Sequence, residues 1–111
     1  MTVWRVYYHL VWATKGRTLL ITPQIKPELY RFIRTKTKSL DCSFYAIGGM
    51  PDHIHLIVSI PPSRAISDFV KRIKGSSSRH ISRRFPDKPF AWQREYAVFS
   101  FGKKQMAKAI A

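Results

Sequence analysis

The stretch Gly48-Gly49-Met50-Pro51-Asp52-His53-Ile54-His55-Leu56-Ile57-Val58 places two histidines one residue apart inside an apolar run. Side chains at positions i and i+2 of a β-strand point to the same face, so His53 and His55 share a face. The alternate positions form an unbroken apolar row, made of Ile54, Leu56, Val58 and Ile60. This alternation predicts a strand whose histidines lie on the face away from the core.

A His-x-His pair on a strand has two interpretations. Imidazole nitrogens are common ligands of metal ions, which makes His53 and His55 a candidate metal site. The alternative is that both rings are ordinary histidines satisfied by nearby carbonyls or by solvent. The strand phase weakens this alternative but does not exclude it.

The composition predicts one folded domain, covering residues 1–111, with a polyanionic partner. Hydrophobic residues make up 45% of the chain and aromatic residues 14%, which favours a globular protein over a disordered basic tail. Twenty Lys and Arg against six Asp and Glu give a net charge of +14. No apolar run approaches the roughly 20 residues of a membrane-spanning helix, and no signal peptide is apparent. Nucleic acid, rather than a membrane, is therefore the expected partner.

Cys42 is the only cysteine of the chain. A single cysteine excludes an intrachain disulfide and a cysteine-based zinc site, and it fits a reducing cytoplasm. Because Cys42 stands at the start of an apolar strand, we expect a small core residue rather than a nucleophile.

The elements alternate in type along the chain. Residues 3–13 have the two-residue period of a first strand, and Thr22 with Pro23 favours the start of a helix that continues to about Leu40. A second strand is expected at about residues 43–48, and residues 49–52 turn the chain into the histidine strand.

The second half of the chain predicts a helix, a strand and a final helical segment. Ser63 is the expected cap of the second helix, and residues 75–78 (Gly-Ser-Ser-Ser) are expected to interrupt or loosen it. A fourth strand is expected near residues 96–101, followed by a helical segment at 103–111.

The resulting order, strand, helix, strand, strand, helix, strand, is that of an α+β, ferredoxin-like β-α-β-β-α-β sandwich. Such a fold is an antiparallel sheet with two helices on one face, here with a short C-terminal helical segment added. The other face stays open for function, and the strand phase assigns His53 and His55 to it.

Four motifs, in order, resemble one family over nearly the whole chain. They are residues 8–15 (YHLVWATK), 49–55 (GMPDHIH), 73–79 (IKGSSSR) and 92–100 (WQREYAVFS). The chain thus resembles the small single-tyrosine transposases of bacterial and archaeal insertion sequences, within the HUH group of nucleases, with TnpA-like and REP-associated relatives.

The resemblance implies a homodimeric enzyme that recognises hairpins in single-stranded DNA. In that family a tyrosine of the last helix attacks a phosphodiester, which leaves a 5′-phosphotyrosine and a free 3′-hydroxyl. A divalent ion, Mg²⁺ or Mn²⁺, would be held here by His53 and His55. Family members complete the metal site with a polar side chain, often glutamine, one helical turn after the tyrosine.

The expected last helix departs from the family pattern. It reads Met-Ala-Lys-Ala-Ile-Ala over residues 106–111, without tyrosine, and the nucleophile would fall at or beyond Ala111. Gln105 precedes that point and does not match the metal-binding glutamine. The chain's own tyrosines, Tyr7, Tyr8, Tyr30, Tyr45 and Tyr96, are expected to be core or sheet aromatics.

Three functions follow from these observations. The first is a dimeric, metal-dependent insertion-sequence transposase subunit that acts on single-stranded DNA and whose catalytic tyrosine is missing from this chain. The second is a non-cleaving remnant that binds hairpin DNA. The third, ranked well behind, is a ferredoxin-like RNA-binding module, which should carry base-stacking aromatics on its central strands.

Basic and hydroxyl side chains give the candidate DNA contacts. They are Lys15 and Arg17 after the first strand, and Arg72, Lys74, Ser76, Ser77 and Arg79 on the second helix. For His9 on the first strand, a third-ligand role competes with a structural hydrogen bond, which is favoured. His80 is expected at the surface or facing DNA.

Overall fold

The computed structural model describes residues 6–101, in which four strands and two helices follow one another in the expected order. The elements are β1 (Tyr7–Ala13), the 3-10 turn η1 (Lys15–Arg17), α1 (Ile25–Ser39), β2 (Ser43–Met50), β3 (His53–Ser59), α2 (Ile66–Arg84) and β4 (Ala97–Phe101). The strands form one sheet in the order β2-β3-β1-β4, and each neighbouring pair is antiparallel. This topology confirms the ferredoxin-like prediction.

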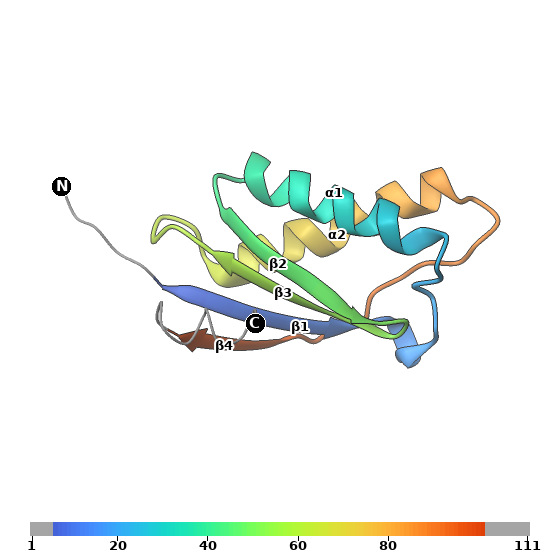
Figure 1. Cartoon of the computed structure of the whole chain (residues 1–111), viewed down its shortest axis with the longest axis horizontal. Coiled ribbons are helices and arrows are strands. Elements are labelled where there is room, and N and C mark those ends of the chain that lie inside the picture. The colour runs from blue at the N-terminus through green and yellow to red at the C-terminus, as the bar shows by residue number, and fades with distance from the viewer. Residues whose placement is uncertain (1–5, 102–111) are drawn as a thin grey trace.

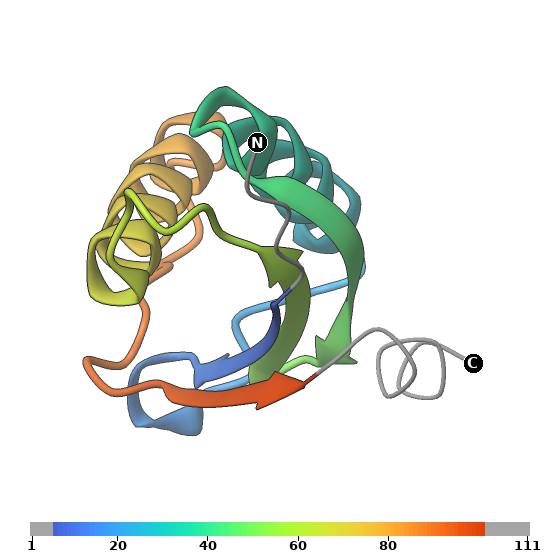
Figure 2. The ribbon, with the colours of Figure 1, turned by 90° about the vertical axis from the view of Figure 1, so that its left-hand side faces the viewer.

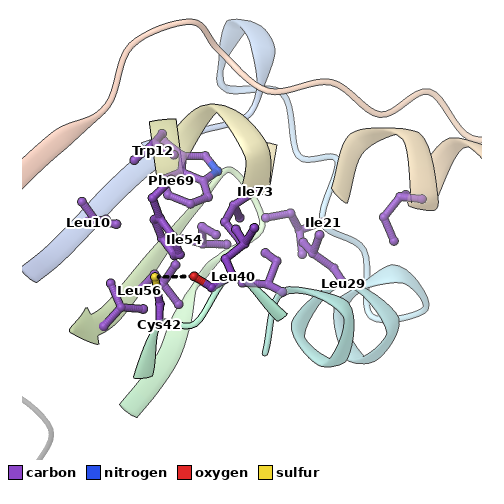
Figure 3. Close-up of a cluster of buried hydrophobic side chains, with 14 of the residues drawn as sticks. Leu10, Trp12, Ile21, Leu29, Leu40, Cys42, Ile54, Leu56, Phe69 and Ile73 are labelled. Atoms are coloured by element: carbon purple, nitrogen blue, oxygen red, sulfur yellow. Dashed lines mark hydrogen bonds between the residues drawn. The ribbon is translucent and has the colours of Figure 1, made fainter. Parts of the chain in front are cut away.

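Both helices lie on the same face of the sheet, which curves around them (Figures 1 and 2). The core between the layers contains the apolar row of β3, with Ile54 and Leu56 fully buried (Figure 3). Val58 of the same row is also fully buried. Cys42 belongs to this core, as expected, and its thiol donates a hydrogen bond to the Leu40 carbonyl. Burial raises the pKa of the Cys42 thiol, which disfavours the reactive thiolate.

The sheet face opposite the helices is open only in part. Toward the end of β3, Ile57 and Ser59 are buried although they share the histidine face. At the start of β1, Tyr7 is also buried, and its ring meets Tyr45 edge-on at a centroid distance of 5.2 Å. The open region is therefore concentrated at the His53 and His55 end of β3.

Helix α2 differs from its prediction in two ways. It runs without interruption from Ile66 to Arg84. The hydroxyls of Ser76 and Ser77 donate to helix carbonyls one turn back, and the buried Ser77 packs into the core side of the helix. The expected cap at Ser63 is also wrong. Ala65 occupies the N-cap position and no side chain caps the helix.

Helix α1 begins at Ile25, after a turn at residues 23–24, yet the hydroxyl of Thr22 accepts the Ile25 amide hydrogen at 3.2 Å. At the contact between α1 and α2, Nε2 of His80 lies 2.8 Å from Oε2 of Glu28, and its ring stacks on Phe32. His80 therefore lies at the surface, as expected, with 33% of its side chain exposed, but its ring is engaged by α1. The hydrogen bond with His80 lowers the pKa of Glu28.

The expected final helix at 103–111, with Gln105, lies outside the described residues. Within residues 6–101, neither helix has the length and apolar character needed to cross a bilayer.

Candidate metal and nucleic-acid site

His53 and His55 lie side by side on the open face of β3. Their ring centroids are 5.0 Å apart and the ring planes make an angle of 73°. The sheet register places His55 between Val11 of β1 and Gly48 of β2. A side chain added at Gly48 would meet no atom within 4 Å, so glycine at this position leaves open space beside the ring.

Each ring is engaged through Nδ1, by a different partner. Nδ1 of His53 lies 2.7 Å from Oδ1 of Asp52, and Nδ1 of His55 lies 2.8 Å from Nε2 of His9. The structural hydrogen bond favoured for His9 is therefore present. Because both contacts use Nδ1, Nε2 of each ring is the nitrogen available to bind a ligand.

The surroundings of the site favour a neutral His55 and an ionised Asp52. Burial, followed by the neighbouring His9 and His53, lowers the pKa of His55. Hydrogen bonding from His53 and the charge of Arg17 lower the pKa of Asp52, whose carboxylate lies 3.1 Å from the Arg17 guanidinium. A neutral imidazole is the form that binds a metal ion.

A groove of about 440 Å³ runs along the two histidines between β1, η1 and the segment that leads into β4. Besides His53 and His55, charged or polar lining side chains come from Arg17, Gln93, Glu95 and Tyr96. A second hollow of about 320 Å³ lies on the β2 side of His55 and is lined by His9 and Gly48. His55 thus faces open space on both sides.

The segment 93–95 contributes Gln93 and Glu95 to one wall of the groove and is tied to β1 and α2. Its backbone bonds to the end of β1, with the Gln93 amide donating to the Ala13 carbonyl at 2.8 Å. The Lys74 ammonium, on α2, donates to the carbonyls of Gln93, Arg94 and Glu95. Burial lowers the pKa of Lys74, an effect that Glu95 opposes.

Replacing Lys74 by methionine is expected to loosen this wall, because one ammonium satisfies three carbonyls of the segment. The loss should be about 1.5 to 3 kcal/mol, the usual range for hydrogen bonds to a charged group. Hydrogen exchange at residues 93–95 should accelerate, and urea unfolding should report the loss of stability. Lys71→Met, which removes an exposed lysine of the same helix, is the matched control; equal exchange in the two variants would contradict the role given to Lys74.

The remaining DNA candidates fall into two places. Lys15 and Arg17 are exposed in η1, and Arg17 lines the groove. Arg72 and Arg79 are exposed on α2, in the helical layer, where Arg72 pairs with Asp68.

The α2 hydroxyls have partners within the protein. Ser76 donates to the Arg72 carbonyl, while Ser77 is buried and its hydroxyl accepts the Trp92 indole N–H at 2.9 Å. Burial corrects the expectation that Ser77 contacts phosphate and gives it a packing role. The Lys74 ammonium is engaged by the carbonyls of the segment 93–95. The candidate DNA-contacting residues that remain exposed are Lys15, Arg17, Arg72 and Arg79.

The donor set fits a divalent ion only in part. Two imidazoles with Nε2 at one groove are suitable nitrogen ligands. Among residues 6–101, however, no group of three His, Cys, Asp or Glu side chains is arranged to hold a metal ion. The described residues therefore supply two ligands, and oxygen ligands from DNA or water would have to complete the shell.

Sequence reasoning missed two acidic residues of this site. Asp52 directly precedes His53, so the sequence alone indicates that the two residues are close. The contact of Asp52 with Arg17 could not be predicted in this way, because it joins two separate turns. Glu95 reaches the groove only through the fold, since 40 positions separate it from His55 and 42 from His53.

Comparisons with known proteins agree with this architecture. The family model described as "Transposase IS200 like" matches residues 2–111. The ISDra2 transposase TnpA of Deinococcus radiodurans is 33% identical over 76% of this chain, which spans 60% of that relative. The transposase for insertion sequence element IS200 of Salmonella typhimurium is 29% identical over 92% of the chain and 71% of its own length.

Two solved structures share the fold. A protein of Deinococcus radiodurans R1, described as a candidate transposase, aligns with a TM-score of 0.85 and 30% identity, over 98% of this chain and 88% of that one. A REP-associated tyrosine transposase bound to a REP hairpin aligns with a TM-score of 0.64 and 17% identity, over 99% and 68% of the two chains.

Proposed function

Because the chain belongs to the family of IS200-like transposases, we propose that it binds single-stranded DNA hairpins and holds Mg²⁺ or Mn²⁺ between His53 and His55. The observation that carries the proposal is the pair of imidazoles, each engaged through Nδ1, beside a groove that Arg17 also lines. The net charge of +14 supports a polyanionic ligand. The hairpin bound by a structural relative supports DNA as that ligand.

The groove's side chains have separate tasks in this proposal. His53 and His55 offer Nε2 to the metal ion, which would supply Lewis-acid polarisation of a phosphate. Arg17 is 61% exposed and lines the same groove, so it has room to contact phosphate oxygens while it pairs with Asp52.

We assign DNA cleavage to a tyrosine that is not among the five of this chain. In that reaction a tyrosine oxygen forms a bond to phosphorus and the 3′ oxygen leaves, which gives a phosphotyrosine and a 3′-hydroxyl. Tyr7 is buried and Tyr8 packs against the core, whereas Tyr30 lies on α1. Tyr96 is the only tyrosine among the residues that line the histidine groove. The chain alone is proposed to bind without cutting because residues 102–111 contain no tyrosine where the resembled family carries its nucleophile.

A second copy of the chain is the proposed partner protein. Edge strand β4 offers Val98 and Phe99, which are 41% and 57% exposed, as apolar surface for such a contact. An RNA-binding module is less well supported, because central strands β1 and β3 present His9, His53 and His55 to the open region instead of stacking aromatics.

The test is to incubate the protein with labelled single-stranded hairpin DNA, and separately with a duplex of the same sequence, in the presence of Mn²⁺. We expect hairpin affinity to exceed duplex affinity and to fall as salt rises. We expect no DNA to remain attached after denaturation with detergent.

Two results would contradict the proposal. Equal affinity for hairpin and duplex would remove hairpin recognition. A detergent-stable adduct would show that the chain contains its own nucleophile, and its disappearance in Tyr96→Phe but not in Tyr30→Phe would identify that residue as Tyr96.

A further inference from the structure

Asp52 joins a basic residue to one of the two histidines. It occupies the two-residue turn between β2 and β3, and its carboxylate lies 2.7 Å from Nδ1 of His53 and 3.1 Å from the guanidinium of Arg17. The three residues thus form a chain from η1 to β3. The Asp52 side chain is 22% exposed, so the contact is partly shielded from water.

The backbone of Asp52 is fixed as well. Its carbonyl accepts the amide hydrogen of Thr14 at 2.9 Å, whereas the Thr14 hydroxyl makes its shorter contact, at 2.5 Å, with the Thr18 carbonyl. Thr14 is fully buried at the end of β1. The carboxylate is consequently held from both sides, by Thr14 through the backbone and by Arg17 through the side chain.

The two histidines differ in what their Nδ1 partners allow. An ionised carboxylate has no hydrogen to donate, so Asp52 requires a proton on Nδ1 of His53 and leaves the lone pair on Nε2. The partner of His55 is another imidazole, His9, whose Nε2 is able either to donate or to accept. Only the His53 ring therefore has its tautomer set by its neighbour.

We propose that Asp52, held by Arg17, is a positioning residue that fixes His53 in the tautomer with Nε2 open to the groove. The inference rests on the proposed function in one respect, namely that His53 is a metal ligand. A carboxylate behind a ligating imidazole orients the ring and increases its basicity, and the loss of such a partner lowers metal affinity by about 10- to 100-fold. This assignment also gives Arg17 a second task besides contact with DNA.

The same carboxylate and arginine chemistry elsewhere in the chain provides a comparison. Asp68 on α2 pairs with Arg64 at 2.8 Å and with Arg72 at 3.0 Å. Within residues 6–101, its side-chain hydrogen bonds are to these arginines and not to a histidine. Asp68→Asn removes a carboxylate from beside arginine without touching the groove. It is therefore the matched control for Asp52→Asn.

The first measurement is made on the metal-free full chain by nitrogen-15 NMR of the histidine rings at pH 8.5. In the unaltered protein we expect His53 to carry its hydrogen on Nδ1. In Asp52→Asn, whose amide is able to donate as well as accept, we expect a mixture that includes the Nε2–H form. Asp68→Asn should leave the His53 signals unchanged.

The second measurement is a titration with Mn²⁺, followed by electron paramagnetic resonance. We expect the affinity to fall by about 10- to 100-fold in Asp52→Asn and not to change in Asp68→Asn. Arg17→Met, which leaves the carboxylate in place, should give a smaller fall. If Asp52→Asn does not fold, the Arg17→Met spectra and titration carry the test, because a released carboxylate should broaden the His53 signals.

The results separate the two proposals. The positioning role is overturned if Asp52→Asn keeps His53 in the Nδ1–H form. If Asp52→Asn does not fold, the positioning role is overturned when Arg17→Met matches the unaltered protein in both the NMR spectra and the Mn²⁺ titration. If the tautomer changes in Asp52→Asn but the unaltered protein binds no Mn²⁺, the positioning role stands and the metal site proposed above fails. If the tautomer changes and Mn²⁺ affinity does not, Asp52 orients His53 but His53 is not a metal ligand.

Discussion

Replacing His53 and His55 together by alanine is expected to abolish Mn²⁺ binding while much of the DNA affinity remains. The centroids of the two rings lie 5.0 Å apart on one strand. Among the described residues that line the groove, His53 and His55 are the only histidines, and each has Nε2 available for a metal ion. DNA affinity should survive because it depends on phosphate contacts from arginines and lysines outside the pair, of which Arg17, Arg72 and Arg79 are exposed. A Mn²⁺ titration and a DNA binding curve at two salt concentrations measure the two effects separately.

The control for this double variant is His80→Ala, which also removes an imidazole but acts at the contact between α1 and α2. It should bind Mn²⁺ with unchanged affinity. Unchanged Mn²⁺ affinity in the variant that lacks both His53 and His55 would refute the site. A complete loss of DNA binding there would mean that DNA is held mainly through the metal ion.

Replacing Gly49 by alanine is expected to destabilise the hairpin that carries the histidines. Gly49 has φ of +147°, a conformation that side-chain-bearing residues rarely adopt. An added Cβ would also lie 2.8 Å from the Ile54 Cα and closer still to the His53 carbonyl oxygen, both of which are backbone atoms that cannot rotate away. The backbone strain alone should cost about 1 to 3 kcal/mol, and the clash adds to it.

Gly48→Ala is the matched control because it is the neighbouring residue of the same strand, with open space where its Cβ would lie. Urea unfolding of the two variants should show a large loss of stability for Gly49→Ala and a small change for Gly48→Ala. Because Gly49 pairs with Ile54, between the two histidines, Mn²⁺ affinity should fall only in Gly49→Ala. Equal stability of the two variants would rule out the close approach described for Gly49.

The parts of the fold that sequence predicted best are those with strong periodicity. In β3 the alternation separated Ile54 and Leu56, both fully buried, from His53 and His55 on the other face. A strand has only two faces, so one apolar row is sufficient to decide the phase. The order of the elements predicted a ferredoxin-like sheet, which the strand order confirms, with β1 next to β3.

Local propensity failed where tertiary packing competes with it. Glycine and three serines at 75–78 predict a break in the second helix, yet Ser77 is buried and bonded to Trp92 from outside the helix. The burial of α2 against the sheet offsets the weak helical preference of these residues. In the same way, a basic residue of a helix predicts an exposed phosphate contact, whereas Lys74 is engaged by the segment 93–95.

The sequence by itself determined the strand phase, the fold order and the presence of two histidines on one open face, because each follows from local spacing and residue type. Only the tertiary structure decided which neighbours the rings have. The contacts of Asp52 with Arg17, of His9 with His55 and of Lys74 with the groove wall join residues from separate elements. Such contacts depend on how turns and helices pack in three dimensions, and periodicity along one chain carries no information about them.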